Sequence, residues 1–222
     1  MDTDSDTEFS KGWLEWFLSL KGSEFFCEID EDYILDRFNL TGLQAEVTYF
    51  QKALELITDS LEEYSESQAE EIENSAKHLY GLIHARYIIT AAGISKMLEK
   101  YKESAFGYCP RVHCNNQPLL PLGITDVPGK YSVFLYCCKC EDVYNPKQNR
   151  HRSVDGAYFG TSFPHMFLDT YPYLKPQLSE SEMKKFRYEP KMFGFKLHAV
   201  SHIHKWQDLK RSEMVARILN DS

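Results

Sequence analysis

Apolar residues in the first 104 positions recur every three or four residues, which is the spacing of one face of an α-helix. Four stretches show this spacing, at residues 13–20, 47–57, 72–87 and 94–101. Gly93 stands between the last two stretches and is predicted to interrupt the helix, because glycine disfavours a helix interior. This part of the chain is therefore predicted to form helices that bury their apolar faces in one core.

The pattern changes after Ala105. Proline, glycine and asparagine become frequent, and the apolar stretches shorten to lengths typical of strands, as at residues 131–136. Residues 169–190 combine prolines with charges and predict an irregular connector, whereas residues 191–198 are again β-like. Residues 207–219 favour a final helix. Helices first and short strands later indicate an α+β protein.

Charge is unevenly distributed along the 222 residues. Residues 1–80 carry 5 Lys and Arg against 20 Asp and Glu, a net −15, and the remainder carries 20 against 13, a net +7, which gives −8 in total. This imbalance favours electrostatic recognition of a partner. A stretch of acids without a basic residue predicts a solvated acidic loop over about residues 59–73: Asp59, Glu62, Glu63, Glu66, Glu70, Glu71 and Glu73.

The composition also argues against several classes of protein. No apolar run reaches the roughly 18 residues that a membrane span needs, so no membrane is expected as a partner. The start of the chain, MDTDSDTEFS, is acidic and unlike a signal peptide, so we expect a protein of the cytoplasm and nucleus. No dense stripe of Lys and Arg alternates with aromatic residues, so nucleic acid is not the expected partner.

Five of the six cysteines lie between residues 107 and 140, and four of them form two pairs. Four residues separate Cys109 from Cys114, two separate Cys137 from Cys140, and 22 separate the pairs. In a reducing compartment such pairs are more often metal ligands than disulfides. Two turns that each supply two thiolates suit the tetrahedral preference of Zn²⁺, and four cysteines leave no position open for water. We therefore predict one structural zinc ion per chain.

The other thiols and the histidines are predicted to lie outside this site. Cys138 lies within the second pair, where its side chain is expected to point away, and Cys27 is expected to be a buried free thiol. His113, His202 and His204 are expected to be surface residues. A redox role is not expected for the second pair, because no helical stretch follows it as a thioredoxin-like motif requires.

The cysteine run and several other stretches resemble the casein kinase II regulatory (beta) subunit family. In the run, CPRVHC at 109–114 is followed by LPLG at 120–123 and then by Val133 and the second pair at 137–140. The other stretches occur in family order over about residues 12–198. They are WLEWF at 13–17, EFFCEIDEDY at 24–33, FNLTGL at 38–43, LYGLIHARY at 79–87, DGAYFG at 155–160, FPHM at 163–166 and GFKLH at 194–198. The chain departs from the family pattern at Phe134, where a basic residue is usual, at Cys138, where proline is usual, and after residue 198.

The resemblance implies a non-catalytic regulatory subunit. Such subunits dimerise through their zinc ribbons and hold two catalytic (alpha) subunits in a tetramer of two regulatory and two catalytic chains, whose activity and substrate choice they modulate. This sequence agrees in lacking the glycine-rich nucleotide loop and the Val-Ala-Ile-Lys, His-Arg-Asp and Asp-Phe-Gly motifs of a kinase. By resemblance, the dimer contact falls on Pro110, Val112 and Val143, and the kinase contact on a C-terminal hairpin with Met192, Phe193 and Phe195, with Met166 in a neighbouring turn.

Two regulatory features also follow from the resemblance. Thr3 and Ser5 are each followed by an acid three residues later, the pattern that an acidophilic kinase reads, so phosphorylation by the partner kinase is expected there. The acidic loop is expected to attract polyamines and basic protein substrates.

The expected fold is an N-terminal all-α domain over residues 1–104, followed by a four-cysteine zinc-ribbon β domain over residues 105–165 that carries the dimer contact. An extended C-terminal tail with a short β-hairpin, residues 166–222, is expected to bind the kinase. Two other classes remain open on the sequence. A zinc-ribbon nucleic-acid or transcription module would use the excess of two basic charges in residues 107–150, and a zinc enzyme would need an open coordination position.

Overall fold

The computed structural model describes residues 12–61, 66–179, 191–196 and 202–220. The chain divides into two compact units, residues 1–178 and 179–222. Thr3, Ser5, Glu62 and Glu63 lie outside the described residues. Helices and strands together give the expected α+β class. Among the described helices, none is both long and apolar enough to cross a membrane.

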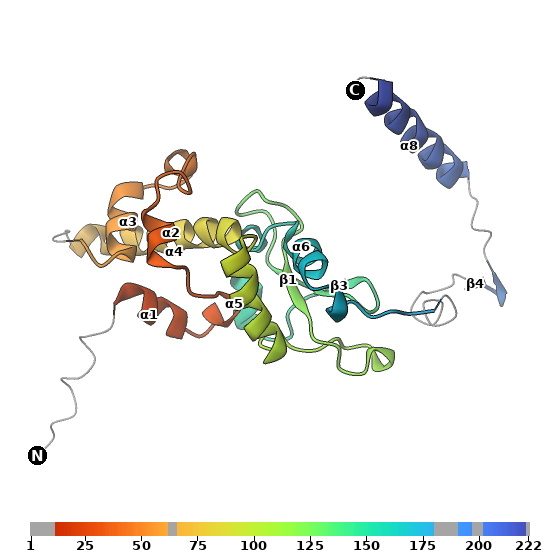
Figure 1. Ribbon diagram of the computed structural model, residues 1–222, viewed down its shortest axis with the longest axis horizontal. Helices are drawn as coiled ribbons and strands as arrows, with labels where there is room; N and C mark the ends of the chain where they lie inside the picture. The colour runs from red at the N-terminus through yellow and green to blue at the C-terminus, as the bar shows by residue number, and fades with distance from the viewer. Residues whose placement is uncertain (1–11, 62–65, 180–190, 197–201, 221–222) are drawn as a thin grey trace, which may run out of the picture. The chain divides into compact units, whose positions relative to one another are not determined.

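The first part of the chain is helical, as its apolar spacing predicts (Figure 1). Its elements are α1 (Trp13–Ser19), the 3₁₀ helix η1 (Ser23–Phe25), α2 (Glu31–Leu35), the 3₁₀ helix η2 (Leu43–Ala45), α3 (Phe50–Ile57), α4 (Glu66–Tyr87) and α5 (Ala91–Lys102). Helix α4 packs along α3, and its predicted apolar face, with Ile72, Leu79 and Ile83 among its members, is fully buried. Val47 is buried too, but it precedes α3 in a turn.

Polar side chains of α4 hydrogen-bond to segments that have no regular structure. The hydroxyl of Tyr80 donates to the carbonyl of Cys27 at 2.9 Å, and that of Tyr87 donates to Asp30 at 2.8 Å. Arg86 donates to the carbonyls of residues 39 and 41. Buried backbone groups need such partners because burial removes water. Helix α4 therefore fixes the path of the chain between α1 and α3.

His84, also on α4, has no exposed surface. Its Nε2 accepts a hydrogen bond from the backbone N–H of Cys27 at 3.1 Å, and its Nδ1 donates to the carbonyl of Tyr158 at 2.8 Å. These partners hold the ring as the neutral Nδ1–H tautomer. Desolvation is the main reason that the pKa of His84 falls to about 4.

The predicted acidic loop is shorter than residues 59–73. Helix α4 begins at Glu66, so Glu66, Glu70, Glu71 and Glu73 lie on the helix, and of the acids before it the structure describes only Asp59. Carboxylates are favourable in the first turn of a helix because they face its positive dipole end. Asp59 accepts the backbone N–H of Trp13 at 2.8 Å, so it holds the start of α1.

Gly93 does not interrupt the helix, contrary to the prediction. Helix α5 begins at Ala91, and Thr90 caps it by accepting the N–H of Gly93 at 3.2 Å. A Cβ on Gly93 would lie 2.1 Å from the carbonyl oxygen of Tyr87. Glycine is therefore needed for the close approach of two helices rather than for a break. The break lies in the residues just before Thr90.

The second part of the first unit contains a small antiparallel sheet in the order β1 (Leu120–Leu122), β2 (Phe134–Cys137) and β3 (Asp142–Tyr144). In this sheet Leu120 pairs with Tyr136, and Cys137 pairs with Asp142. Helix α6 (Phe163–Thr170) packs on β1. The 3₁₀ helices η3 (Val112–Cys114), η4 (Asn149–Ser153), η5 (Gly156–Tyr158) and η6 (Pro172–Leu174) connect these elements.

Aromatic side chains join the helical part to the sheet part. Phe25 packs edge-on against Phe106 and Phe159, with ring centroids 5.6 Å and 6.4 Å apart, and Phe26 lies 5.4 Å from Phe159. All four rings are buried. Truncating one buried phenylalanine to alanine typically costs about 3–5 kcal/mol. The two parts therefore share one core and are expected to unfold together.

The second unit contains a hairpin of β4 (Lys191–Met192) and β5 (Phe195–Lys196), and helix α8 (His202–Asn220). Helix α8 includes the predicted residues 207–219. Met192 pairs with Phe195 across a two-residue turn in which Phe193 and Gly194 have φ of 51° and 84°. Positive φ at both turn residues is typical of the type I′ hairpin turn, in which glycine is favourable and phenylalanine is rare.

Acidification should destabilise the first unit through His84. The unfolded chain binds a proton at this histidine below about pH 6.5, whereas the folded chain binds it only near pH 4, so stability is lost as the pH falls between these values. The difference amounts to about 3 kcal/mol. Denaturant unfolding should show a weaker pH dependence in His84→Gln than in the wild type over this window. An unchanged slope in His84→Gln would contradict the prediction.

Candidate functional site

The first pair of cysteines lies in a tight turn before β1. The N–H of Cys109 donates to the carbonyl of Gln117 at 2.8 Å, and the N–H of Cys114 donates to that of Arg111 at 2.9 Å. The next two residues, Asn115 and Asn116, have φ of 52° and 55°. Asparagine tolerates this left-handed conformation better than most residues, which lets the chain reverse just after the second thiol.

The second pair lies in the turn between β2 and β3. Strand β2 ends at Cys137, and the N–H of Glu141 donates to the carbonyl of Cys137 at 2.9 Å. Glu141 has a φ of 56°, so the chain turns sharply and β3 runs back along β2. The turn leaves Cys140 partly exposed, whereas the other three thiols are buried.

The two turns bring the four predicted ligands together. The Sγ atoms of Cys109 and Cys140 are 3.8 Å apart, those of Cys114 and Cys137 are 4.0 Å apart, and all four lie within 4.8 Å of one another. Four sulfurs that bind one tetrahedral Zn²⁺ at about 2.3 Å lie about 3.8 Å from each other. A disulfide would need about 2.05 Å, and all six cysteines are free thiols. The arrangement fits a structural metal site and leaves no ligand position vacant.

Without a metal ion, Cys114 and Cys137 resist ionisation. Burial is the main cause that raises the pKa of Cys114 to about 12, and it raises that of Cys137 as well. Burial also opposes ionisation of Cys109, but hydrogen bonds, first from the backbone at Arg111, hold its pKa below the ordinary value. Four adjacent thiolates would repel one another unless a cation lay between them. The cluster is therefore suited to binding a cation.

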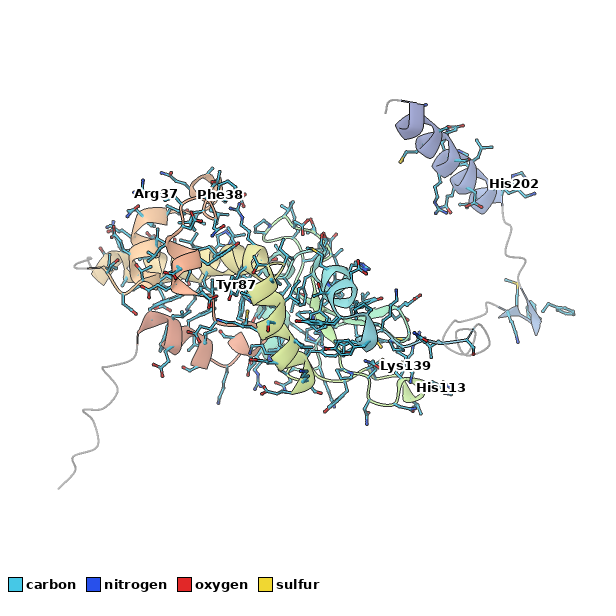
Figure 2. All side chains as sticks on the ribbon, in the orientation of Figure 1. Arg37, Phe38, Tyr87, His113, Lys139 and His202 are labelled. Carbon is cyan, nitrogen blue, oxygen red and sulfur yellow. The ribbon has the colours of Figure 1, made fainter. Side chains whose placement is uncertain are left out.

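Three polar contacts surround the cluster, and no sequence motif indicates them. The hydroxyl of Tyr144 lies 3.2 Å from the Sγ of Cys140. Arg111 of the first turn forms an ion pair with Asp142 of the second at 2.6 Å. Lys139, which is labelled in Figure 2, donates to the carbonyl of Cys114 at 3.4 Å. These contacts depend on how the two turns fold against each other.

The remaining cysteines lie where the sequence predicts. Cys138 is buried, is not part of the cluster, and has its Sγ 4.0 Å from the carbonyl oxygen of Leu174. Cys27 is buried, and desolvation is the main reason that its pKa rises to about 12. Neither thiol is therefore a candidate nucleophile. His113 and His202 are exposed as expected, and the side chain of His204 lies outside the described residues.

The residues expected at the dimer contact are all exposed. Val112 is 88% exposed and Val143 41%, and Pro110 is exposed as well. Val112 lies between the first two thiols and Val143 three residues after the last, so both flank the metal site. Exposed apolar side chains that gather on a small surface are typical of protein contacts.

The residues expected at the kinase contact are also exposed. Met192 is 58% exposed, Phe193 95% and Phe195 79%, and all three lie on the hairpin of the second unit. Met166 is 39% exposed on α6 of the first unit. Within the part of the chain that the structure describes, the hairpin residues are therefore not core residues of a sheet.

The acidic residues of α4 differ in their contacts. Glu71 accepts a hydrogen bond from Tyr49 at 2.9 Å, and Glu73 forms an ion pair with Lys77 one helical turn away. Glu70 is exposed. The charge available to a partner is thus smaller than the count of acids suggests.

Comparison with known proteins identifies close relatives. A family model described as "Casein kinase II regulatory subunit" matches residues 12–196. Casein kinase II subunit beta of Schizosaccharomyces pombe is 54% identical over 217 residues, which cover 97% of this chain and 92% of the relative. Subunit beta-2 of Neurospora crassa is 52% identical over 217 residues, covering 97% and 74% of the two chains. Subunit beta' of Saccharomyces cerevisiae is 49% identical over 224 residues, covering 98% and 85%. These alignments extend beyond residue 198, where no match was expected from the sequence.

Proposed function

We propose, from the premise that the chain belongs to the casein kinase II regulatory subunit family, that it dimerises through a zinc-loaded ribbon and holds a catalytic subunit with its C-terminal hairpin. The family is the regulatory subunit of the kinase and not the catalytic one. In the proposed assembly, two copies of this chain and two catalytic subunits form a tetramer in the cytoplasm and nucleus. The regulatory pair stabilises the kinase and modulates its choice of substrates.

The observation that carries the proposal is the four-thiol cluster with exposed apolar residues on either side. Cys109, Cys114, Cys137 and Cys140 would hold one Zn²⁺, which would fix the two turns relative to each other. Val112 lies in the first turn and Val143 on β3 directly after the second, so fixing the turns also shapes the apolar surface. A small sheet buries little area by itself, and metal binding and dimerisation together supply the missing stability. Two copies of one surface can pair across a twofold axis.

The exposed hairpin supports the second half of the proposal. Met192, Phe193 and Phe195 present three large apolar side chains on six residues of chain. Solvent exposure of such side chains is unfavourable unless a partner covers them, and large aromatics are the side chains that dominate interface energetics. The hairpin belongs to a different unit from the cysteine cluster. The two proposed contacts can therefore be disrupted separately.

The acidic stretch supports a third proposed function. Residues 59–73 contain seven acids and no basic residue, and the four that lie on α4 begin at its first turn. We propose that this stretch attracts polyamines and basic segments of protein substrates. Phosphorylation at Thr3 or Ser5 would add negative charge to an N-terminus that is already acidic.

The purified wild type should contain one zinc ion per chain and be dimeric. Cys109→Ser removes one of four ligands, so we expect loss of zinc and dissociation of the dimer. Cys138→Ser is the matched control, because that thiol lies in the same turn but outside the cluster, and it should retain both. Elemental analysis and light scattering measure the two properties. A zinc-free wild type, or a Cys109→Ser variant that stays dimeric, would rule out the proposed role of the cluster.

The hairpin should be required for kinase binding but not for zinc binding or dimerisation. Aromatic anchors typically cost about 2 kcal/mol or more on truncation, which corresponds to roughly a thirtyfold loss of affinity. Calorimetry with the catalytic subunit should show at least this loss for the double variant Phe193→Ala, Phe195→Ala. Trp206→Ala is the control, since Trp206 is an aromatic of the same unit that is 61% exposed. Normal binding by the double variant would show that the contact lies elsewhere.

Polyamine binding should depend on the acidic stretch and weaken with salt. Exposed charges are screened beyond about 8 Å at physiological ionic strength. The triple variant Glu62→Gln, Glu63→Gln, Glu66→Gln should therefore bind spermine more weakly at low salt and approach the wild type at high salt. A control with the same change in charge, Glu28→Gln, Glu31→Gln, Asp32→Asn, alters exposed acids elsewhere and should bind like the wild type. Equal effects of both triples would point to net charge instead of a defined site.

A further inference from the structure

The four thiols of the cluster are not equally protected. Cys109, Cys114 and Cys137 are at most 4% exposed, whereas Cys140 is partly exposed. A chelator, an oxidant or an alkylating reagent would therefore reach the sulfur of Cys140 first. Any group that lies against this sulfur influences how easily the metal is lost.

Tyr144 is the side chain that lies against it. Strand β3 pairs with β2 so that Tyr144 is opposite Leu135, and the sharp turn at Glu141 brings its ring back toward the second turn. The phenol oxygen is 3.2 Å from the Sγ of Cys140. A tyrosine hydroxyl keeps its proton at neutral pH and a metal-bound thiolate has none, so in the loaded site the hydroxyl is the donor.

A hydrogen bond to a thiolate has definite chemical consequences. Four thiolates and one divalent cation leave a net negative charge on the site, which donors around the sulfurs disperse. Sulfur that accepts a hydrogen bond is a weaker nucleophile, because its lone-pair electrons are lowered in energy. Arg111, held by Asp142 at 2.6 Å, adds a positive charge near the cluster.

We propose that Tyr144 is a positioning residue of the metal centre, whose hydroxyl orients and shields Cys140 and so controls how fast the metal leaves. This inference rests on the proposed zinc site and adds a residue that is not itself a ligand. In the sequence, Tyr144 is simply a tyrosine four residues after the last cysteine, and its position alone does not indicate a role. Its role follows from the register of β2 and β3.

The test compares Tyr144→Phe with Tyr108→Phe in the full-length, zinc-loaded protein. Tyr144→Phe removes one oxygen from a partly exposed side chain and leaves the strand intact. Tyr108 precedes the first cysteine and is 55% exposed, and within the described residues its hydroxyl has no contact with a sulfur. We expect Tyr144→Phe to transfer zinc to a chromogenic chelator about tenfold faster than the wild type or more, since loss of such partners typically costs 10–100-fold in metal affinity. Tyr108→Phe should release zinc at the wild-type rate.

Two further readouts separate a hydrogen bond from a general loosening of the fold. Alkylation by iodoacetamide, in which the thiolate displaces iodide, should accelerate selectively at Cys140 in Tyr144→Phe, as peptide mass spectrometry would show. In the cobalt-substituted protein, the thiolate-to-metal charge-transfer band should move to longer wavelength. Equal acceleration at all four cysteines with an unshifted band would overturn the inference, as would wild-type behaviour of Tyr144→Phe. A wild type without zinc would overturn the proposed metal site and the inference together, whereas a zinc-containing wild type with an unaltered Tyr144→Phe would overturn the inference alone.

Discussion

The fold depends on hydrogen bonds from one long helix to the backbone of segments that lie outside the α-helices and strands. Tyr80 and His84 of α4 bond to the backbone of residues 27 and 29, and His84 also bonds to the carbonyl of Tyr158. The backbone of an irregular segment can be buried only when each polar group finds a partner. These bonds join segments that are 51–74 residues apart in the chain. Without them the aromatic core between the helical part and the sheet part could not be closed.

The sheet part has a different requirement, since four thiols lie close together in it. Its two turns are connected by the ion pair between Arg111 and Asp142 and by the hydrogen bond from Lys139 to the carbonyl of Cys114. Neither contact can offset the repulsion among four thiolates, so a bound cation is the natural stabilising element. The same cation would hold the exposed Val112 and Val143 in one arrangement. The bonds between the cation and the thiolates would thus support both the stability of this part of the molecule and its recognition of a partner.

Local sequence patterns predict structural features that depend on neighbouring residues. They miss features that depend on contacts between distant parts of the chain. The apolar spacing of residues 72–87 predicts the buried face of α4, and the spacing of the cysteines predicts which four thiols meet, because each is a property of one helix or one turn. The prediction that Gly93 interrupts a helix was wrong. Glycine is needed there because the carbonyl oxygen of Tyr87, which precedes α5, leaves no room for a side chain. The hydrogen bonds of His84 and the position of Tyr144 depend on long-range contacts and on strand register, neither of which a motif records.

The turn of the C-terminal hairpin places phenylalanine in a backbone conformation that this residue rarely adopts. A two-stranded hairpin is marginally stable in water, and a strained turn residue lowers its stability further. A partner that recognises the closed turn binds only that fraction of molecules in which the turn is closed, so its apparent affinity falls in proportion to that fraction. The strength of the assembly would then be a property of the unbound chain as well as of the contact. Substitutions in the turn could tune the assembly's lifetime across related proteins while every contacting side chain stays the same.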